Sequence, residues 1–479
     1  MFPLTLAWPT EAIETVIVLV YLILALSVTV DVLLKKSDVR AALGWIAAAW
    51  LSPIFGLLLY YMFGINRVTR RALRLRRSDE SQARRGPDGT KPVASPNIAL
   101  LAEVGQRITE SPLAAGNAIA VLEGGDEAYP AMLAAIAGAG KSIAMASYIY
   151  RDDAAGKAFS DALIAARERG VEVRVLLDGV GTGYIFAGAF NRLVAGGIKA
   201  ARFLHTWVPW RMPFLNMRNH RKFLIIDGAL AFTGGMNIDA AQARRLAGRR
   251  PYIEDVHFKI EGPVVRSLMD AFARDWTFTT DEPLDEDHWW PPIAEAGAVQ
   301  ARGLRSGPDA DLYKIEMLAG AALTLARKRL RIVTPYFLPD ARLQFAIAEA
   351  CMRGVEVEIV LPLKSDHVFM DWAMMGHLRF FKHIPVKVYL SPPPFDHSKL
   401  MTVDGEWSLI GSSNWDARSF RLNFEYDLEC YQPDLTVRLD RIIDARIAQG
   451  RKLSHAELAT RPVLIRLRDA AARLLLPYL

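Results

Sequence analysis

Two segments of the chain carry the same chemically useful residues at the same spacing. Each segment begins with a histidine and a lysine two positions apart, followed by an aspartate, a glycine and an asparagine. The first set is His220, Lys222, Asp227, Gly234 and Asn237, and the second is His397, Lys399, Asp404, Gly411 and Asn414. A single His-x-Lys pair is common by chance, but two copies with identical internal spacing predict one active site built from two halves.

The residue types indicate a negatively charged ligand. The apolar run 223–226 predicts a strand, on which residues two positions apart point to the same face, so His220 and Lys222 should face one ligand. Asn237 should bring an amide to the same place from a neighbouring strand. The second copy repeats the arrangement with His397, Lys399, Ser412 and Asn414. Two imidazoles, two ammonium groups and two amides around one small anion indicate a phosphodiester substrate.

Two histidines permit a two-step displacement at phosphorus. One histidine attacks to form a covalent phosphohistidine, while the other donates a proton to the leaving alkoxide and then accepts one from the incoming hydroxyl or water. The lysines and amides would stabilise the charge that develops on the equatorial phosphate oxygens. This chemistry requires no metal and no cofactor. The sequence leaves open which histidine is the nucleophile, and we favour His220.

Carboxylates should orient the imidazoles by accepting a hydrogen bond from the second ring nitrogen. We expect Glu425 to orient His397 and Asp255 to orient His220. Glu425 ends the segment Ser419–Glu425, and Asp255 lies in the segment Ile253–His257.

The two motif aspartates, Asp227 and Asp404, have two possible roles. Both are candidate catalytic residues, because they belong to the repeated set. Each also lies at a predicted turn, where an aspartate side chain commonly accepts hydrogen bonds from backbone amides. The sequence does not decide between the two roles.

A second repeat surrounds the motifs. The five residues Arg169 to Val173 recur as Arg353 to Val357, and each copy joins a predicted helix to a predicted strand. Alternating strands and helices indicate an α/β fold, and the repeat indicates a duplication. We therefore expect two mixed-sheet α/β halves that share one active site, the first at residues 97–290 and the second at residues 291–479.

The first 66 residues are strongly apolar and predict a membrane-inserted helical hairpin. Its spans are expected at about residues 13–34 and 41–66, because a membrane helix needs roughly 20 apolar residues. Pro53 and Gly56 lie inside the second span, where a membrane helix can tolerate them. A basic linker at residues 67–96 should connect the hairpin to the body.

Basic residues flank the second span at both ends. Three lie in the turn before it, and six follow it: Lys35, Lys36 and Arg40, then Arg67, Arg70, Arg71, Arg74, Arg76 and Arg77. The larger group predicts a multi-pass protein with a cytoplasmic body, since basic flanks stay in the cytoplasm. A shallow hairpin that does not fully cross would instead put both groups on one face.

The composition favours an anionic partner. The chain of 479 residues has a formal net charge of +6, which suits nucleic acid or an acidic membrane surface. Cys351 and Cys430 are the only cysteines, so no disulfide framework is expected. The C-terminal residues 461–479 alternate arginine with leucine, which is typical of an amphipathic helix at a membrane surface or of a packing helix of the second half.

The two motifs resemble the HKD signature of the phospholipase D superfamily. The resemblance to this superfamily covers essentially the whole chain, and within it the chain looks most like the bacterial cardiolipin synthases. Similar blocks are the second apolar span, Tyr148–Asp153, Arg218–Lys222, Thr233–Gly235, Thr334–Phe337 and Ser419–Glu425. The resemblance implies phosphatidyl transfer in a bacterial inner membrane. One phosphatidylglycerol would form a phosphatidyl-histidine and release glycerol, and a second would accept the phosphatidyl group to give cardiolipin.

Two other functions remain open. A membrane phospholipase D that uses water or another alcohol shares the chemistry, because pocket shape and water access select the acceptor. A phosphodiesterase or nuclease of the same superfamily would suit the positive charge, but the membrane hairpin argues against it. The expected partners are therefore phosphatidylglycerol and an anionic membrane, with no nucleic acid, and the oligomeric state is not indicated.

Overall fold

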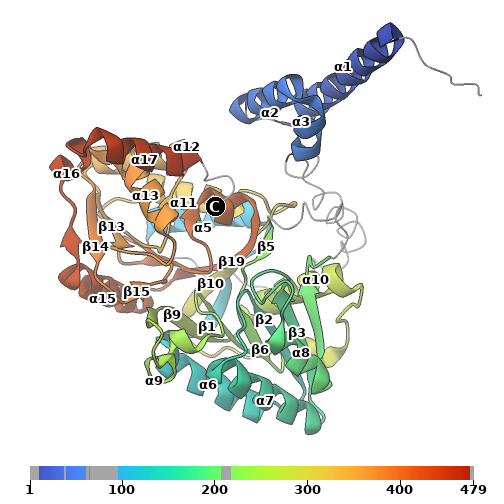
Figure 1. The fold of residues 1–479 in the computed structure, drawn as a ribbon. Coiled ribbons are helices and arrows are strands. Elements are labelled where there is room, and N and C mark those ends of the chain that lie inside the picture. The colour runs from blue at the N-terminus through green and yellow to red at the C-terminus, as the bar shows by residue number, and fades with distance from the viewer. Residues whose placement is uncertain (1–9, 37–38, 61–63, 65–94, 207–216, 475–479) are drawn as a thin grey trace, which may run out of the picture. The chain divides into compact units, whose positions relative to one another are not determined.

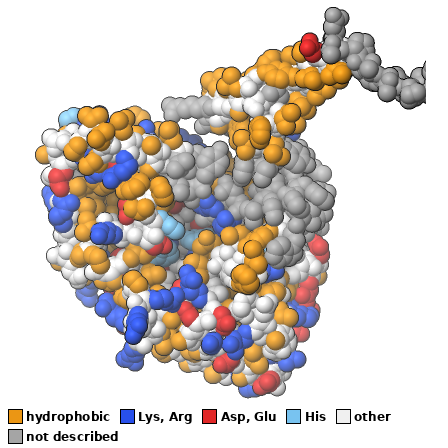
Figure 2. All heavy atoms as spheres, in the orientation of Figure 1, with side chains coloured by type: hydrophobic (Ala, Val, Ile, Leu, Met, Phe, Trp, Pro, Cys, Tyr) orange, Lys and Arg blue, Asp and Glu red, His pale blue; other side chains and the backbone are white. Residues whose placement is uncertain are grey.

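The computed structural model describes residues 10–36, 39–60, 64, 95–206 and 217–474. They form two compact units, a set of N-terminal helices and an α/β body. The N-terminal unit consists of α1 (Thr10–Lys35), α2 (Val39–Leu51) and α3 (Pro53–Leu59). Their surfaces are largely hydrophobic (Figure 2).

Within the described residues, α1 alone is long and apolar enough to cross a membrane, over the 24 residues Ala12–Lys35. The second span expected at 41–66 is interrupted in its described part, because α2 ends at Leu51 and α3 begins at Pro53. A proline has no N–H and displaces the preceding residue, here Ser52, from the helical conformation. Residues 61–63 and 65–66 of that span lie outside the described residues.

The first half of the body alternates strands and helices (Figure 1). Its strands are β1 (Ala114–Glu123), β2 (Ser142–Ser147), β3 (Glu172–Asp178), β4 (Lys199–Phe203), β5 (Arg218–Asn219), β6 (Phe223–Ile226), β7 (Leu230–Gly234), β8 (Ile253–Glu254) and β9 (Val256–Glu261). Its helices, including the one that precedes β1, are α5 (Pro96–Thr109), α6 (Gly125–Gly138), α7 (Ala154–Glu168), α8 (Gly188–Ala195), α9 (Arg244–Ala247) and α10 (Val265–Thr280).

The second half repeats this order. Its strands are β10 (Val299–Ser306), β11 (Arg329–Val333), β12 (Phe337–Leu338), β13 (Glu356–Pro362), β14 (Lys387–Ser391), β15 (Phe395–Asp396), β16 (Leu400–Val403), β17 (Trp407–Gly411), β18 (Trp415–Asp416), β19 (Asn423–Tyr431) and β20 (Arg451–Lys452). Its helices are α11 (Lys314–Leu325), α12 (Ala341–Met352), α13 (Val368–Leu378), α14 (Ala417–Arg421), α15 (Pro433–Gln449), α16 (His455–Ala459) and α17 (Val463–Leu474).

Sixteen strands form one continuous mixed sheet, and its order shows the duplication directly. From one edge the order is β4-β3-β2-β6-β7-β9-β1, and the same series follows in reverse as β10-β19-β17-β16-β11-β13-β14, with β20 at the far edge. The sixteenth strand, β5, pairs with β19 outside this order. The halves meet where β1 pairs antiparallel with β10. Parallel pairs such as β2 with β3 and antiparallel pairs such as β2 with β6 make the sheet mixed. The predicted duplicated α/β fold is confirmed, although the two halves share a single sheet.

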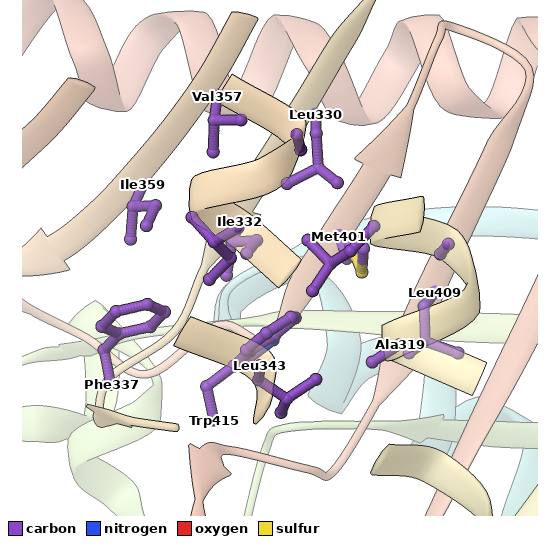
Figure 3. Close-up of a cluster of buried hydrophobic side chains, with 14 of the residues drawn as sticks. Ala319, Leu330, Ile332, Phe337, Leu343, Val357, Ile359, Met401, Leu409 and Trp415 are labelled. Atoms are coloured by element: carbon purple, nitrogen blue, oxygen red, sulfur yellow. The ribbon is translucent and has the colours of Figure 1, made fainter. Parts of the chain in front are cut away.

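The same local devices recur in both halves. Asp153 accepts hydrogen bonds from the first amides of α7, and Asp340 does so for α12, which fixes where each helix begins. On β11 and β13, alternate residues such as Leu330, Ile332 and Ile359 point into the core beneath α11 and α12 (Figure 3).

Helix α5 ties the start of the body to its far half. Ile98 and Leu101 of α5, together with Leu113, belong to the hydrophobic core that is otherwise made by the second half. Arg302 of β10 also donates a 2.7 Å hydrogen bond to the carbonyl oxygen of Ala102. The segment that precedes β1 therefore packs away from the strands that follow it in sequence.

Candidate active site

Two short strands carry each histidine to the opposite half of the body. Strand β5 pairs in parallel with β19 of the second half, and β15 pairs in parallel with β8 of the first half. The backbone amide of His220, just after β5, donates to the carbonyl oxygen of Phe424 at 2.9 Å. The amide of His397, just after β15, donates to the carbonyl oxygen of Glu254 at 2.7 Å. The two motifs are thereby interleaved across the sheet.

This crossing decides which carboxylate orients which imidazole. His220 Nδ1 lies 2.9 Å from Glu425 Oε2, and His397 Nδ1 lies 2.9 Å from Asp255 Oδ2. Both pairings expected from the sequence were therefore wrong, although the two carboxylates were correctly chosen. The physical reason is the strand pairing: β5 places His220 beside the residue before Glu425, and β15 places His397 beside the residue before Asp255.

The lysines lie with the histidines in one buried cluster. Lys222 Nζ donates to the backbone oxygen of His220 at 2.6 Å, and Lys399 Nζ donates to that of His397 and lies 2.9 Å from its Nδ1. All four side chains are buried. The charge of Lys399 acts on His220 and that of Lys222 acts on His397, so the two motifs form a single electrostatic site.

Burial dominates the protonation of this cluster. It lowers the pKa of both histidines well below its usual value, and the nearby lysines lower it further. Burial also lowers the pKa of Lys222 to about 7, against the opposing charge of Glu425, and that of Lys399 to about 8, against Asp255. Both imidazoles are therefore neutral near pH 7 in the free protein, as a nucleophile requires.

The carboxylates respond in the opposite direction. Burial raises the pKa of Asp255 to about 7 and raises that of Glu425, while Lys399 and Lys222, respectively, oppose the shift. A phosphodiester would bring a negative charge among these groups, and this charge favours protonation of a histidine. The site can thus supply the charged imidazolium needed by a general acid once its substrate is bound.

The polar residues of the turns after β7 and β17 differ between the halves. Ser412 Oγ donates to Glu425 Oε2 at 2.5 Å, and the carbonyl oxygen of Ser412 lies 3.1 Å from His220 Nδ1. Ser412, expected to bind phosphate or orient a group, therefore holds the carboxylate that orients His220. Its counterpart is Gly235, where an added Cβ would come within 2.5 Å of Asp255 Oδ1.

The two asparagines of the motifs are buried. The side-chain oxygen of Asn237 accepts a hydrogen bond of 3.2 Å from the backbone amide of Ile149. This bond fixes the orientation of the buried Asn237 side chain. The backbone amide of Asn414 donates to Ser419 Oγ at 3.3 Å. Among the described residues, no group donates a hydrogen bond to Asn414 Oδ1, although this atom is buried.

The motif aspartates support the fold. Asp227 accepts hydrogen bonds of 2.7 to 2.9 Å from the amides of Gly140, Lys141 and Ser142, at the start of β2. Asp404 accepts the equivalent three, from Arg327, Lys328 and Arg329 at the start of β11. These contacts support the backbone-capping role, which is one of the two roles that the sequence left open.

Several side chains at the site were not predicted. The ring of Tyr148 contacts the edge of His220 at a centroid distance of 4.8 Å and lies 5.3 Å from Lys222 Nζ. The charge of Arg418 adds to the lowering of the pKa of His220. Asp366, which accepts a hydrogen bond from Tyr336, opposes the lowering of the pKa of His397 by burial. Tyr148 and Tyr336 lie in blocks that carried the family resemblance, and this was the available signal.

The comparisons with known proteins agree along the chain. The family model described as "Cardiolipin synthase, PLD-like domain" matches residues 132–276 and 320–447, and "Phospholipase D-nuclease N-terminal" matches residues 23–64. The chain is 30% identical to the cardiolipin synthase of Geobacillus kaustophilus, covering 93% of this chain and 90% of that protein. It is 30% identical to the major cardiolipin synthase ClsA of Bacillus subtilis, covering 98% and 100%.

A solved structure supports the fold. The phosphatidylserine synthase of Haemophilus influenzae matches with a TM-score of 0.63 and 18% identity, covering 79% of this chain and all of that one. The two matched copies of the PLD-like domain and the relatives aligned along nearly the whole chain show that this protein is an enzyme of the phospholipase D superfamily and belongs to its cardiolipin synthase family.

Proposed function

We propose that the protein is a phosphatidyltransferase that makes cardiolipin from two molecules of phosphatidylglycerol and releases glycerol. The observation that carries the proposal is the interleaved pair of buried histidines, each held by a carboxylate of the other half and accompanied by a lysine. The names of the relatives supply the lipid product, cardiolipin.

The first step forms a covalent intermediate. We assign His220 as the nucleophile: its neutral Nε2 attacks phosphorus, while its Nδ1–H donates to Glu425. The phosphorus–oxygen bond to glycerol breaks, and His397, protonated in the presence of the bound anion, donates its proton to the leaving alkoxide. The ammonium groups of Lys222 and Lys399 stabilise the charge on the phosphate oxygens.

The second step regenerates the enzyme. His397, now neutral, removes a proton from the free primary hydroxyl of a second phosphatidylglycerol. The resulting oxygen attacks the phosphatidyl-histidine, and the phosphorus–nitrogen bond to His220 breaks. Asp255 holds the ring of His397 through both proton transfers. Each histidine thus returns to its starting state after one turnover.

We also propose that the protein resides in a bacterial inner membrane with its catalytic body in the cytoplasm. The apolar helix α1 supports a membrane location. The arginines that follow residue 66 support the orientation, because basic flanks remain on the cytoplasmic side.

The purified full-length protein should be tested in phosphatidylglycerol vesicles with a chelator of divalent metals. Glycerol release and cardiolipin formation would be measured together by enzymatic assay and mass spectrometry. We expect one glycerol for each cardiolipin. Phosphatidic acid as the sole lipid product would contradict the proposal and identify water as the acceptor.

A further inference from the structure

The C-terminal helix α17 has its apolar face turned outward. Four large apolar side chains on it are between 61% and 80% exposed: Val463, Leu464, Leu467 and Leu474. On a helix of 3.6 residues per turn they fall within an arc of about 100°. Arg466 and Arg473 lie on one side of this arc, and Arg468 lies on the other. We call these seven residues the α17 surface.

The opposite side of α17 is fixed to the body. Asp469 and Ala472 are buried, and the backbone of Asp469 lies so close to Gly376 of α13 that an added Cβ there would be 3.1 Å away. Arg468 lies 4.6 Å from the ring centroid of Trp372, also on α13. The helix is therefore anchored in part by small and polar residues, and its four exposed apolar side chains face away from the protein.

Helix α13 connects this surface to the active site. Asp366, just before α13, accepts a hydrogen bond from Tyr336. The charge of Asp366 is also close enough to His397 to oppose the lowering of the pKa of that histidine by burial. The first turn of α13 exposes Val368 and Phe369. Hydrophobic side chains gather where α12, α13 and α17 lie (Figures 1 and 2).

We propose that the α17 surface docks on a membrane that carries anionic lipids. The apolar arc would enter the boundary between headgroups and acyl chains, and the flanking arginines would bind phosphate groups. A second copy of the chain is a poorer occupant, because its arginines would face these arginines. Docking would hold the start of α13, and with it the active site, next to the lipid layer. This proposal concerns attachment and does not depend on the reaction.

The test uses the full chain with Leu467→Cys labelled by an environment-sensitive fluorophore. Cys351 and Cys430 are buried and should not be labelled in the folded protein. In vesicles of phosphatidylcholine with phosphatidylglycerol, we expect a blue-shifted emission that brominated acyl chains quench. A label at Lys452→Cys, on the exposed strand β20, is the matched control and should stay in water.

Charge should govern the effect. Replacing Arg466 and Arg473 by glutamine should weaken the quenching at position 467 in vesicles with phosphatidylglycerol. A label at 467 that remains in water would overturn the proposal. A blue shift that grows with the amount of protein on the vesicles, and that brominated lipid does not quench, would show that a second copy of the chain covers the α17 surface. This result would also overturn the proposal.

The three N-terminal helices pack against one another. Helix α2 runs back along α1, and a hydrogen bond of 3.1 Å from Trp50 Nε1 to Thr29 Oγ1 joins the two helices. Helix α3 then folds back along α2: the rings of Trp45 and Tyr60 are 5.4 Å apart, and Gly56 packs against the backbone of Ala48. In each of these two contacts, one residue precedes Ser52 and the other follows it at nearly the same sequence distance. Helices α2 and α3 therefore form a helical hairpin that turns at Ser52.

The end of α3 returns to the end of α1. Tyr60 Oη donates to Asp31 Oδ2 at 2.7 Å, and Lys35 pairs with the same carboxylate. A continuous helix from Val39 would place Tyr60 about 30 Å further on, beside the start of α1. The observed contact puts Tyr60 instead on the side where α2 began.

We infer that α1 crosses the membrane once and that α2 and α3 form a re-entrant hairpin in one leaflet. The chain then leaves Tyr60 on the side that holds Lys35 and Lys36, and in the sequence the arginines come soon after it. Both basic groups thus satisfy the positive-inside rule, which two full crossings could not achieve. This topology has one crossing, whereas hydropathy alone predicts two.

The position of the N-terminus distinguishes the two topologies. In cells that express full-length protein, Thr5→Cys should react with a membrane-impermeant maleimide from outside, whereas Lys452→Cys should react only after the membrane is opened. Two crossings would put both positions on the same side. Equal protection or equal labelling of the two cysteines in intact cells would therefore overturn the single crossing.

Discussion

His220 Nδ1 lies 2.9 Å from Oε2 of Glu425, a residue 205 positions further along the chain. The reciprocal contact joins His397 to Asp255 over 142 positions at the same distance. Each histidine is therefore oriented by the other half of the duplicated body. Neither half by itself therefore holds a histidine together with the carboxylate that orients it.

Both histidines should be essential, for different reasons. We expect His220→Ala and His397→Ala each to lower turnover by about a thousandfold or more while the melting temperature stays near that of the parent protein. A phosphatidyl ester with an acidic leaving group needs no general acid, so it separates the two roles. With this substrate, His397→Ala should accumulate a labelled adduct on His220, and His220→Ala should form none. Adduct formation in His220→Ala would reverse the assignment.

Each carboxylate that contacts a histidine of the other half should raise the pKa of that histidine in the bound complex. Asp255→Asn removes a charge that stabilises imidazolium, so the pKa of His397 in the bound complex should fall. The alkaline limb of the pH-rate profile, where the protonated acid is lost, should then move to lower pH, with kcat reduced by about a hundredfold or more. A smaller kcat with an unchanged profile would indicate a purely structural role.

The buried lysines should make stability depend on pH. The pKa of Lys399 is about 8 in the folded protein against 10.5 when exposed, so the unfolded chain binds more protons between these values. Stability should therefore rise as the pH increases from about 8 to 10. Lys399→Met should flatten this rise in the melting temperature. An identical slope in the variant would show that other groups are responsible.

The motif aspartates should affect stability more than catalysis. Asp227→Ala leaves three amides at the start of β2 without their acceptor, which should cost about 2 to 4 kcal/mol of unfolding free energy. The turnover of the folded fraction should change little. A large fall in kcat at unchanged stability would restore the catalytic role. Asp404→Ala is the matched test in the second half.

Gly235 should be intolerant of a methyl group. An alanine Cβ there would come within 2.5 Å of Asp255 Oδ1 and would displace the carboxylate from His397. We expect Gly235→Ala to lower kcat by about tenfold or more, since misplaced catalytic groups lose rate steeply. Gly138→Ala, with no atom within 4 Å of the added Cβ, is the control and should leave kcat unchanged.

Much of the site could be predicted from local pattern. The spacing of His220 and Lys222 predicted that both face one ligand, and the second copy at His397 and Lys399 indicated the duplication and a shared anion site. The strands begin only at Phe223 and Leu400, so each His-x-Lys pair lies between two strands, although its side chains still belong to one buried cluster. The family resemblance added Tyr148 and Tyr336 within its blocks, although not their contacts.

The sequence by itself determined the reacting groups, the duplicated α/β fold and the apolar N-terminal segment. The tertiary structure alone decided that Glu425 serves His220, that Asp227 caps β2, and that the second apolar segment turns back at Ser52. The reason is that β5 and β15 each have only two residues, and their pairing with the opposite half is set by the register of distant strands. Local residue patterns do not encode such non-local pairings.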